Sequence, residues 1–401
     1  MEFLGSYILY FTILVLSVIC AYRIEQSETE GEERGFRILL FLVLTVPAVL
    51  RYDIGTDYPH YVLIYDFIAD VNVERVEWGY RFLCSLLNRI GADSFWMFFV
   101  MSILTYAPFC FGTPRSVMTG CTFMFVCAFY LNSYSLIRQA VAVSFLLYAS
   151  FRLLEGRGKR FLVYVVIASL FHRSALLVLP FYFIRKQMEK PWAIACCCCA
   201  AFGVVLGANV IEVLFSNQLF LESSYGRYVD GDFAQETEIG TGLGVLSRMA
   251  LPVLTLLFVR QLREEDAEEE TERETDCINE DRVGLSERDE DTGVESEDKE
   301  DKLENTGYIF LVCIAYVVAM YLASKVYIFN RLNDLFRFVP ILCMGLFFSK
   351  IYFRLKKTVL AGFILLYVLL FALDLVGSAK MVGFVGGLGV MPYQTIFDEL
   401  F

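Results

Sequence analysis

Residues 161–184 read FLVYVVIASLFHRSALLVLPFYFI, and their interpretation decides the topology of the whole chain. The stretch is either one membrane span or two half-length helices, 161–171 and 175–184, that meet at the polar tetrad Phe171–Ser174. A helix of eleven residues rises about 16 Å, so each half would reach only the middle or the far interface of the bilayer. The two readings place everything after residue 184 on opposite sides of the membrane.

The distribution of basic residues favours the two-helix reading. Arg152, Arg157, Lys159 and Arg160 precede the stretch, and Arg185, Lys186 and Lys190 follow it. A chain reversal puts both groups on one side and gives the cytoplasm the excess of Lys and Arg that membrane proteins show, whereas a single span divides these residues equally. We therefore predict a reversal at the tetrad, with both termini outside.

Composition places the rest of the chain in a membrane. The sequence is 57% hydrophobic with a mean hydropathy of +0.55, above the average of about 45–50% for soluble domains. Long apolar runs exclude a soluble enzyme with one anchor, and they exclude an outer-membrane barrel, whose strands alternate. We predict an all-α polytopic membrane protein of about ten full spans, with a broken pair of half-helices at 161–184 and irregular exoplasmic loops that form the site. The spans are expected at 3–22 (retained, not a cleaved signal), 36–50, 95–112, 116–135, 139–151, 192–215, 243–260, 307–324, 337–349 and 358–376.

The net charge of −12 comes from one segment. Residues 262–306 hold nearly half of the 46 Asp and Glu, and without them the chain is slightly basic. This segment lacks aromatic residues and apolar periodicity, so we predict a disordered cytoplasmic linker. It separates an N-terminal transmembrane bundle, 1–261 with an exoplasmic loop at 51–94, from the C-terminal spans and exoplasmic tail of 307–401.

The twelve cysteines do not indicate disulfides or a metal site. Four of them stand in a row at 196–199, where neither disulfide geometry nor metal-ligand spacing can use them. Several others lie in predicted spans, where a cysteine acts as a small apolar residue. With two histidines in the chain, we predict no metal and no cofactor.

The polar residues that flank the spans gather on the predicted exoplasmic side, where charges near the membrane are costly and usually functional. Each has a structural alternative: a flanking arginine commonly extends to the headgroups, and a tyrosine commonly joins an aromatic belt. The group as a whole suits a pyrophosphate, because guanidinium groups pair with phosphate oxygens and stabilise a leaving anion. Its members are Arg51, Asp53, Asp57, Tyr58, Glu77, Tyr80, Arg138, Gln139, His172, Arg173, Arg227, Tyr228, Arg331, Arg337 and Tyr393.

The ordered set of motifs resembles the EpsG family of Wzy-like polysaccharide polymerases. Most of the chain apart from 262–306 takes part in the resemblance. The matching pieces are R-x-x-x-G-T-D-Y at Arg51–Tyr58, E-x-G-Y at Glu77–Tyr80, Ile137-Arg-Gln-Ala140, Ala168–Leu176 around His172, Asn330-Arg-Leu332, and the terminal Pro392–Phe397. The sequence Leu-Asn-Asp-Leu-Phe after Arg331 departs from the aromatic residues that commonly follow there.

The resemblance implies a glycosyltransferase of the bacterial plasma membrane. Such an enzyme joins oligosaccharide repeat units carried on undecaprenyl pyrophosphate, at the outer face, into capsule or exopolysaccharide, with inversion and without a metal. Its partners would be the lipid-linked saccharide, the bilayer and export or chain-length proteins, with no nucleic acid. A ligase, a flippase or transporter, and a non-catalytic scaffold are the alternatives.

The roles follow from the resemblance and from the chemistry of each group. Asp57 or Glu77 would be the base, with Asp57 preferred, and His172 could serve either as a base or as a phosphate ligand. Two further sets complete the prediction: pyrophosphate-binding Arg51, Arg138, Arg173, Arg227 and Arg331, and the saccharide or lipid contacts Tyr58, Tyr80, Gln139, Tyr228 and Tyr393.

Overall fold

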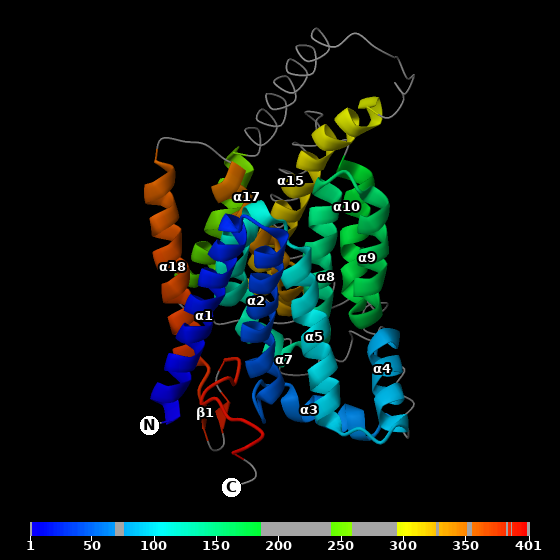
Figure 1. Ribbon diagram of the computed structural model, residues 1–401, viewed down its shortest axis with the longest axis vertical. Helices are drawn as coiled ribbons and strands as arrows, with labels where there is room; N and C mark the ends of the chain where they lie inside the picture. Colours follow the sequence, from blue (N-terminus) through cyan, green and yellow to red (C-terminus); the bar gives the residue numbers. More distant parts are fainter. Residues whose placement is uncertain are drawn as a thin grey trace.

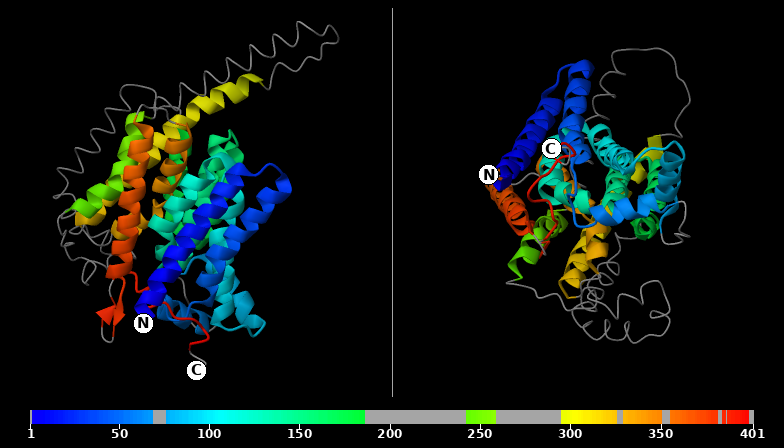
Figure 2. Two further views of the ribbon diagram at one scale, coloured as in Figure 1. Left: turned by 60° about the vertical axis from the view of Figure 1, so that its left-hand side comes forward. Right: turned by 90° about the horizontal axis from the view of Figure 1, so that it is seen from below.

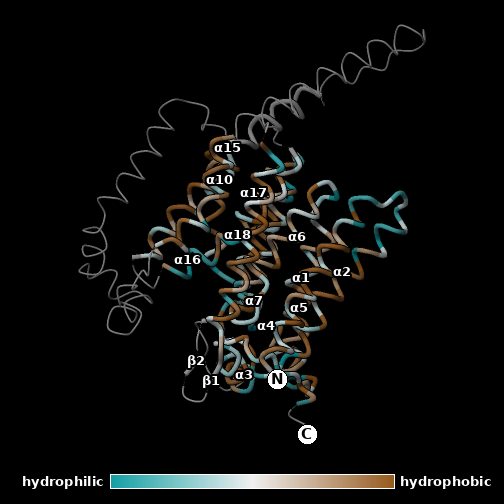
Figure 3. Tube along the Cα trace, turned by 90° about the vertical axis from the view of Figure 1, so that its left-hand side faces the viewer, coloured by the Kyte–Doolittle hydropathy of each residue, from teal (hydrophilic) through white to brown (hydrophobic). Residues whose placement is uncertain are grey.

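The computed structural model of the protein describes residues 2–68, 76–185, 242–258, 295–325, 329–350, 355–381, 384–385 and 387–398. These residues form a bundle of helices that run roughly along one axis (Figure 1). Hydrophobic residues cover most of the length of the helices, and hydrophilic residues gather toward the two ends of the bundle (Figure 3). The protein is therefore an all-α polytopic membrane protein, as predicted.

Six helical stretches of the described residues are long and apolar enough to cross a membrane: Phe3–Gln26, Ser94–Gly112, Arg115–Ser135, Ile137–Leu154, Gly307–Ser324 and Lys356–Gly377. Three other predicted spans are helices in their predicted places but do not meet this standard. One of these, α2 (Glu30–Leu50), has acidic residues in its first turn, and the helices Leu243–Phe258 and α17 (Phe338–Lys350) are short. The predicted span 192–215 lies outside the described residues. The estimate of about ten full spans is thus higher than the six found among the described residues.

The bounds of the helices follow the chain order. They are α1 (Glu2–Gln26), α2 (Glu30–Leu50), α3 (Tyr58–Asp66), α4 (Trp78–Arg89), α5 (Ser94–Gly112), α6 (Met118–Phe125), α7 (Leu131–Ser135), α8 (Ile137–Leu154), α9 (Gly158–Phe171), α10 (Leu179–Ile184), α15 (Glu295–Lys325), α16 (Asn330–Leu335), α17 (Phe338–Lys350) and α18 (Lys356–Gly377).

The bundle has two ends that carry different connections (Figure 1). One end, called the linker end, carries the turns at 27–29, 113–117 and 155–157 and the start of α18. The opposite end, called the site end, carries the loop 51–57, α3, α4 and the C-terminal tail. The loop 51–94 was expected to be irregular, but it contains α3 and α4 because apolar residues of both helices pack on the bundle.

The predicted chain reversal at 171–174 is confirmed. Residue His172 leaves the helical conformation at the end of α9 (φ −153°, ψ 110°), and a 3-10 helix, Arg173–Val178, leads into α10. The returning segment lies along α9, because Tyr182 near its end stacks on Phe161 near the start of α9, with ring centroids 5.6 Å apart. The half-helix pair therefore begins and ends at the linker end and turns at His172.

A π-helical turn, Val126–Tyr130, joins α6 to α7. Such a turn removes backbone carbonyls from the regular hydrogen-bond pattern. The guanidinium of Arg337 supplies a partner, because its Nη1 donates to the Ala128 carbonyl at 2.9 Å while its Nε donates to Asp334 at 2.8 Å. Arg337 is thus used for packing inside the bundle, whereas Arg331, six residues earlier, is exposed.

The helix α15 (Glu295–Lys325) overlaps the last residues of the predicted acidic linker, 262–306. α15 begins at Glu295, so residues 295–306 are the first turns of a helix that continues into the span. Residues 262–294 lie outside the described residues.

The C-terminal tail, residues 387–398, closes the site end against α1 and α2. It follows a small antiparallel hairpin whose two strands, β1 (Lys380–Met381) and β2 (Phe384–Val385), are each two residues long. Long-range hydrogen bonds hold it: Tyr10 Oη donates to the Val390 carbonyl at 2.9 Å, and the Tyr52 amide donates to the Gln394 carbonyl at 2.9 Å. Figure 2 shows the described part of the C-terminal tail (red) beside the N-terminal helices, and α18 alongside α1.

Candidate functional site

Glu77 joins three separate segments at the site end. Its Oε2 lies 2.5 Å from Nη1 of Arg138, and its Oε1 lies 3.3 Å from Nδ1 of His172. Glu77 is the N-cap residue of α4, Arg138 is in the first turn of α8, and His172 is the turn between the half-helices. The bundle therefore gathers one carboxylate, one guanidinium and one imidazole that are far apart in the sequence.

Gly79 allows this contact. An added Cβ at Gly79 would lie 2.9 Å from the carbonyl oxygen of Leu170, closer than side chains tolerate. Since Leu170 stands two residues before His172 and Gly79 two residues after Glu77, the close approach of α4 to the end of α9 sets the distance between Glu77 and His172. The glycine of the E-x-G-Y motif thus has a packing role.

The environment of Glu77 keeps it ionised. Burial of the carboxylate favours its protonated form, but the hydrogen bond with His172 and the charge of Arg138 outweigh burial and lower its pKa to about 2. The Glu77 side chain is 9% exposed. A carboxylate of such low proton affinity is a poor general base, because efficient bases have a pKa near the working pH. Glu77 is suited to hold Arg138 and His172 in place.

Two tyrosines complete the setting of Arg138. The guanidinium carbon lies 5.7 Å from the ring centroids of both Tyr61 and Tyr80. The Tyr80 ring is fully buried, so it packs against Arg138 and does not reach the surface. A cluster of buried apolar residues from α3, α4, α5, α8 and the end of α9 lies beneath this group.

A second ion pair lies beside the first. Arg331 Nη2 is 3.7 Å from Asp57 Oδ2, and the side chains are 55% and 29% exposed. The neighbour of Arg138, Gln139, connects the two pairs, because its Nε2 donates to the Arg331 carbonyl at 2.8 Å. Tyr61 lies beside Arg138, and the charges of Asp57 and Arg331 also act on its hydroxyl group. The pairs therefore form one cluster with a buried half and an exposed half.

The loop that carries Asp57 depends on a glycine. Gly55 has φ +102°, and a Cβ there would lie 2.6 Å from the Tyr134 carbonyl oxygen. The Gly55 amide donates to the Gly389 carbonyl of the tail at 3.0 Å, and the Thr56 amide donates to Oγ of Ser135 at 3.1 Å. Only glycine combines this conformation with this contact, so the G-T-D-Y motif fixes Asp57 at the start of α3.

Arg51 is buried under the tail, where its side chain has packing partners. Its guanidinium carbon lies 5.0 Å from the ring centroid of Phe98 and 4.8 Å from that of Tyr134, and Nη1 donates to the Ala48 carbonyl. Its backbone pairs with Thr395 of the tail. With 3% of the residue exposed, Arg51 holds the tail and the loop together.

The remaining predicted residues fall into three groups. Arg173 is exposed and directly follows His172. Tyr58 and Tyr393 are engaged in packing, since Tyr58 stacks on Phe98 with centroids 4.4 Å apart and Tyr393 Oη donates to the Pro47 carbonyl at 2.7 Å. Arg227 and Tyr228 lie outside the described residues.

Several partner residues at the site belong to no motif of the sequence. Tyr61 and Phe98 contact the predicted arginines, and no motif marked them. An ion pair between Arg248 and Asp374, at 2.7 Å, joins the helix Leu243–Phe258 to α18. A lone aspartate within the apolar run 358–376 was the available signal, since an isolated carboxylate in a span usually has a partner.

The fold and the site define the class of protein: a polytopic membrane protein that holds a cluster of guanidinium, imidazole and carboxylate groups at one end of its spans. The model of the EpsG family matches residues 35–279 and 293–395, and the chain belongs to this family. The family indicates a polysaccharide repeat-unit polymerase with glycosyltransferase-like chemistry, a multi-pass membrane protein that acts on lipid-linked sugars. Comparisons with curated proteins and with solved structures gave no match.

Proposed function

We propose that the protein polymerises oligosaccharide repeat units carried on undecaprenyl pyrophosphate, at the outer face of the bacterial plasma membrane. The site end is the outer end, and both termini lie there. The observation that carries the proposal is the cluster of Glu77, Arg138 and His172 next to the exposed pair of Asp57 and Arg331.

The two ion pairs have different tasks. The pair of Arg138 and Glu77 is short and mostly buried, so the substrate does not separate it, and it serves as the frame of the site. The pair of Arg331 and Asp57 is long and exposed, and such pairs contribute little stability. An entering pyrophosphate takes Arg331 as its partner, and the side chain of Asp57 becomes available to a hydroxyl group.

The reaction uses this exchange. The hydroxyl of the incoming repeat unit attacks the anomeric carbon of the growing chain, and the bond from that carbon to the pyrophosphate oxygen breaks with inversion. Asp57 accepts the hydroxyl proton, and Arg331 with Arg173 stabilises the charge on the leaving pyrophosphate. The two guanidinium groups supply the positive charge that a metal ion supplies in other phosphate chemistry.

His172 positions the donor. The carboxylate of Glu77 stands next to Nδ1, where it favours a proton on that nitrogen, and Nε2 is then left for the substrate. Tyr80, Gln139 and Arg51 support the site by packing and hydrogen bonding, since each is at least nine-tenths buried.

The product made in a deletion strain tests the proposal. We expect single repeat units without complementation, long polymer with the wild-type protein, and single units again with Asp57→Asn inserted at normal level. Asp66→Asn, at the exposed far end of α3, is the matched control and should restore polymer. Long unligated chains in the deletion strain would identify a ligase, and cytoplasmic accumulation of units would identify a flippase; either result contradicts the proposal.

A further inference from the structure

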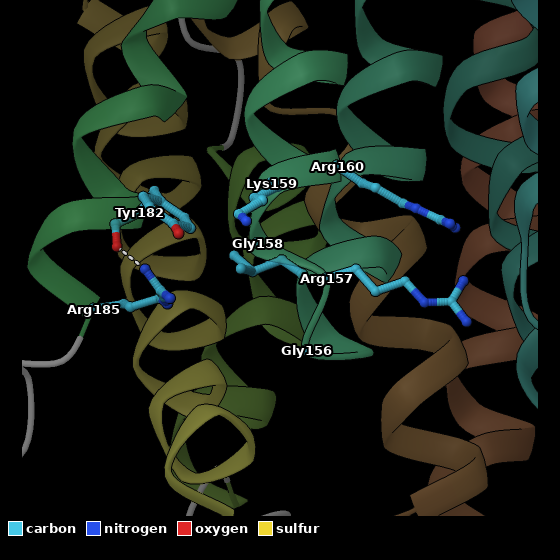
Figure 4. Close-up of a pocket in the computed structure, with 8 residues that line it drawn as sticks. Gly156, Arg157, Gly158, Lys159, Arg160, Tyr182 and Arg185 are labelled. Atoms are coloured by element: carbon cyan, nitrogen blue, oxygen red, sulfur yellow. Dashed lines mark hydrogen bonds between the residues drawn. The ribbon is translucent and has the colours of Figure 1, made fainter. Parts of the chain in front are cut away.

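A pocket of about 360 Å³ lies at the linker end, away from the cluster described above. It opens between the turn that joins α8 to α9 and the last turn of α10 (Figure 4). Its volume is within the range of small-molecule sites, about 300–1,000 Å³. Its lining consists of Leu153, Gly156, Arg157, Gly158, Lys159, Arg160, Tyr182 and Arg185.

The lining is cationic. Four of its residues carry a positive charge and none carries a carboxylate. The nearby Glu155 pairs with Arg152 at 2.7 Å and with Arg157 at 3.4 Å, whereas Lys159 and Arg160 form no ion pair with any residue that the structure describes. In Figure 4 Lys159 points toward Tyr182 and Arg185. Lys159 therefore brings to the pocket a positive charge that no carboxylate of the described residues neutralises, and an anionic ligand would balance it.

The wall opposite Lys159 is preorganised. The guanidinium carbon of Arg185 lies 4.0 Å from the Tyr182 ring centroid, and Arg185 Nη1 donates to the Tyr182 carbonyl. Tyr182 stacks in turn on Phe161. An added Cβ at Gly158 would lie 2.7 Å from the Tyr182 hydroxyl oxygen, so glycine leaves room for that hydroxyl beside the turn. Arg185 and the hydroxyl of Tyr182 are thus held in place before any ligand arrives.

The N-terminus of α9 also contributes positive potential to the pocket. The helix begins at Gly158, and its first backbone amides and positive dipole end lie at the pocket. Cationic side chains, a hydroxyl donor and a helix N-terminus together suit a phosphate group. The aromatic ring of Tyr182 and the side chain of Leu153 suit the apolar part of an amphiphile.

We infer that this pocket binds the phosphate group of an anionic ligand, which is either the headgroup of an anionic phospholipid or a soluble phosphate compound. Its position at the ends of α8, α9 and α10 is the level at which phospholipid headgroups meet a membrane protein. The inference does not depend on the polymerase reaction, because it concerns the opposite end of the bundle.

Thermal unfolding of the full-length protein in nanodiscs tests the inference. The discs contain phosphatidylcholine alone or mixed with phosphatidylglycerol, and inorganic phosphate is added to the first kind in a separate arm with chloride at matched ionic strength. We expect phosphatidylglycerol to raise the apparent Tm of the wild-type protein. Lys159→Ala should lose most of that increase, and Tyr182→Phe should lose part of it.

Lys357→Ala is the matched control, because Lys357 is an exposed lysine at the same end of the bundle, at the start of α18. It should keep the increase. A comparable increase with inorganic phosphate that Lys159→Ala also loses would assign the site to a soluble phosphate compound. Equal losses in the Lys159 and Lys357 variants would show general attraction to surface charge and overturn the inference, as would no increase with either anion.

Discussion

The imidazole of His172 lies 3.3 Å from the carboxylate of Glu77, and this contact places the turn of the half-helix pair beside the start of α4. Both residues are therefore on one side of the membrane, whichever side that is. A single continuous span over 161–184 would not allow the contact, because its middle would lie in the membrane. The distance thus supports the chain reversal independently of the distribution of basic residues.

The site end and the linker end of the bundle should differ in their accessibility from outside the cell. A cysteine placed at Asp93, in the exposed turn between α4 and α5, should react with a membrane-impermeant reagent in whole cells. A cysteine at Glu155, in the exposed turn between α8 and α9, should react only after the membrane is opened. The opposite pattern would place the site end in the cytoplasm and contradict the proposed outer-face reaction.

The pair of Arg138 and Glu77 should show strong coupling in a double-mutant cycle. Either Arg138→Met or Glu77→Gln alone should lower the free energy of unfolding by about 3–5 kcal/mol, because it leaves a buried charge without its partner. The double variant should cost less than the sum of the two. Thermal unfolding of the four proteins measures this, and simple additivity would show that the two side chains do not interact.

Replacing Arg138 with lysine tests whether the site needs the planar shape of the guanidinium group or only a positive charge. Arg138→Lys keeps a positive charge but loses the planar group that lies near both Tyr61 and Tyr80. We expect polymer yield to fall at least about 10-fold, a change of about 1.4 kcal/mol in the barrier, while the protein level stays normal. Arg89→Lys, at the exposed end of α4, is the control and should leave the yield unchanged.

The stability of the protein should depend on Glu77 at acid pH. Its pKa is lowered on folding from 4.5 to about 2, so its carboxylate stabilises the fold above the unfolded pKa, and this stability is lost as the pH falls toward 2. The shift corresponds to about 3 kcal/mol. The apparent Tm of the wild-type protein should therefore fall between pH 5 and pH 3 more steeply than that of Glu77→Gln. Parallel curves for the two proteins would contradict this role.

Gly79→Ala should damage activity through packing. The added methyl group would meet the Leu170 backbone at 2.9 Å and push α4 away from α9, which separates Glu77 from His172. We expect lower stability and loss of polymer. The control, Gly35→Ala in α2, adds the same group where no atom lies within 4 Å, and it should leave both properties intact.

Much of the fold could be predicted from local sequence. Long apolar runs predicted the helices α1, α5, α8 and α18 within a few residues, because a buried helix in lipid needs a continuous apolar surface. The start of α15 and the helices α3 and α4 were missed. Formation of α3 and α4 depends on packing against other segments, which an apolar run does not report.

The candidate site also has features that the sequence predicts and features that it does not predict. From the sequence alone we predicted which residue types stand near the ends of the spans, but not the close backbone contacts of Gly55 and Gly79. The folded chain was needed to show that Glu77 holds Arg138 and His172, that Arg51 is buried by the tail, and that Arg331 pairs with Asp57. The reason is that distance, burial and the resulting proton affinity arise between segments far apart in the chain, and a sequence pattern records each segment separately.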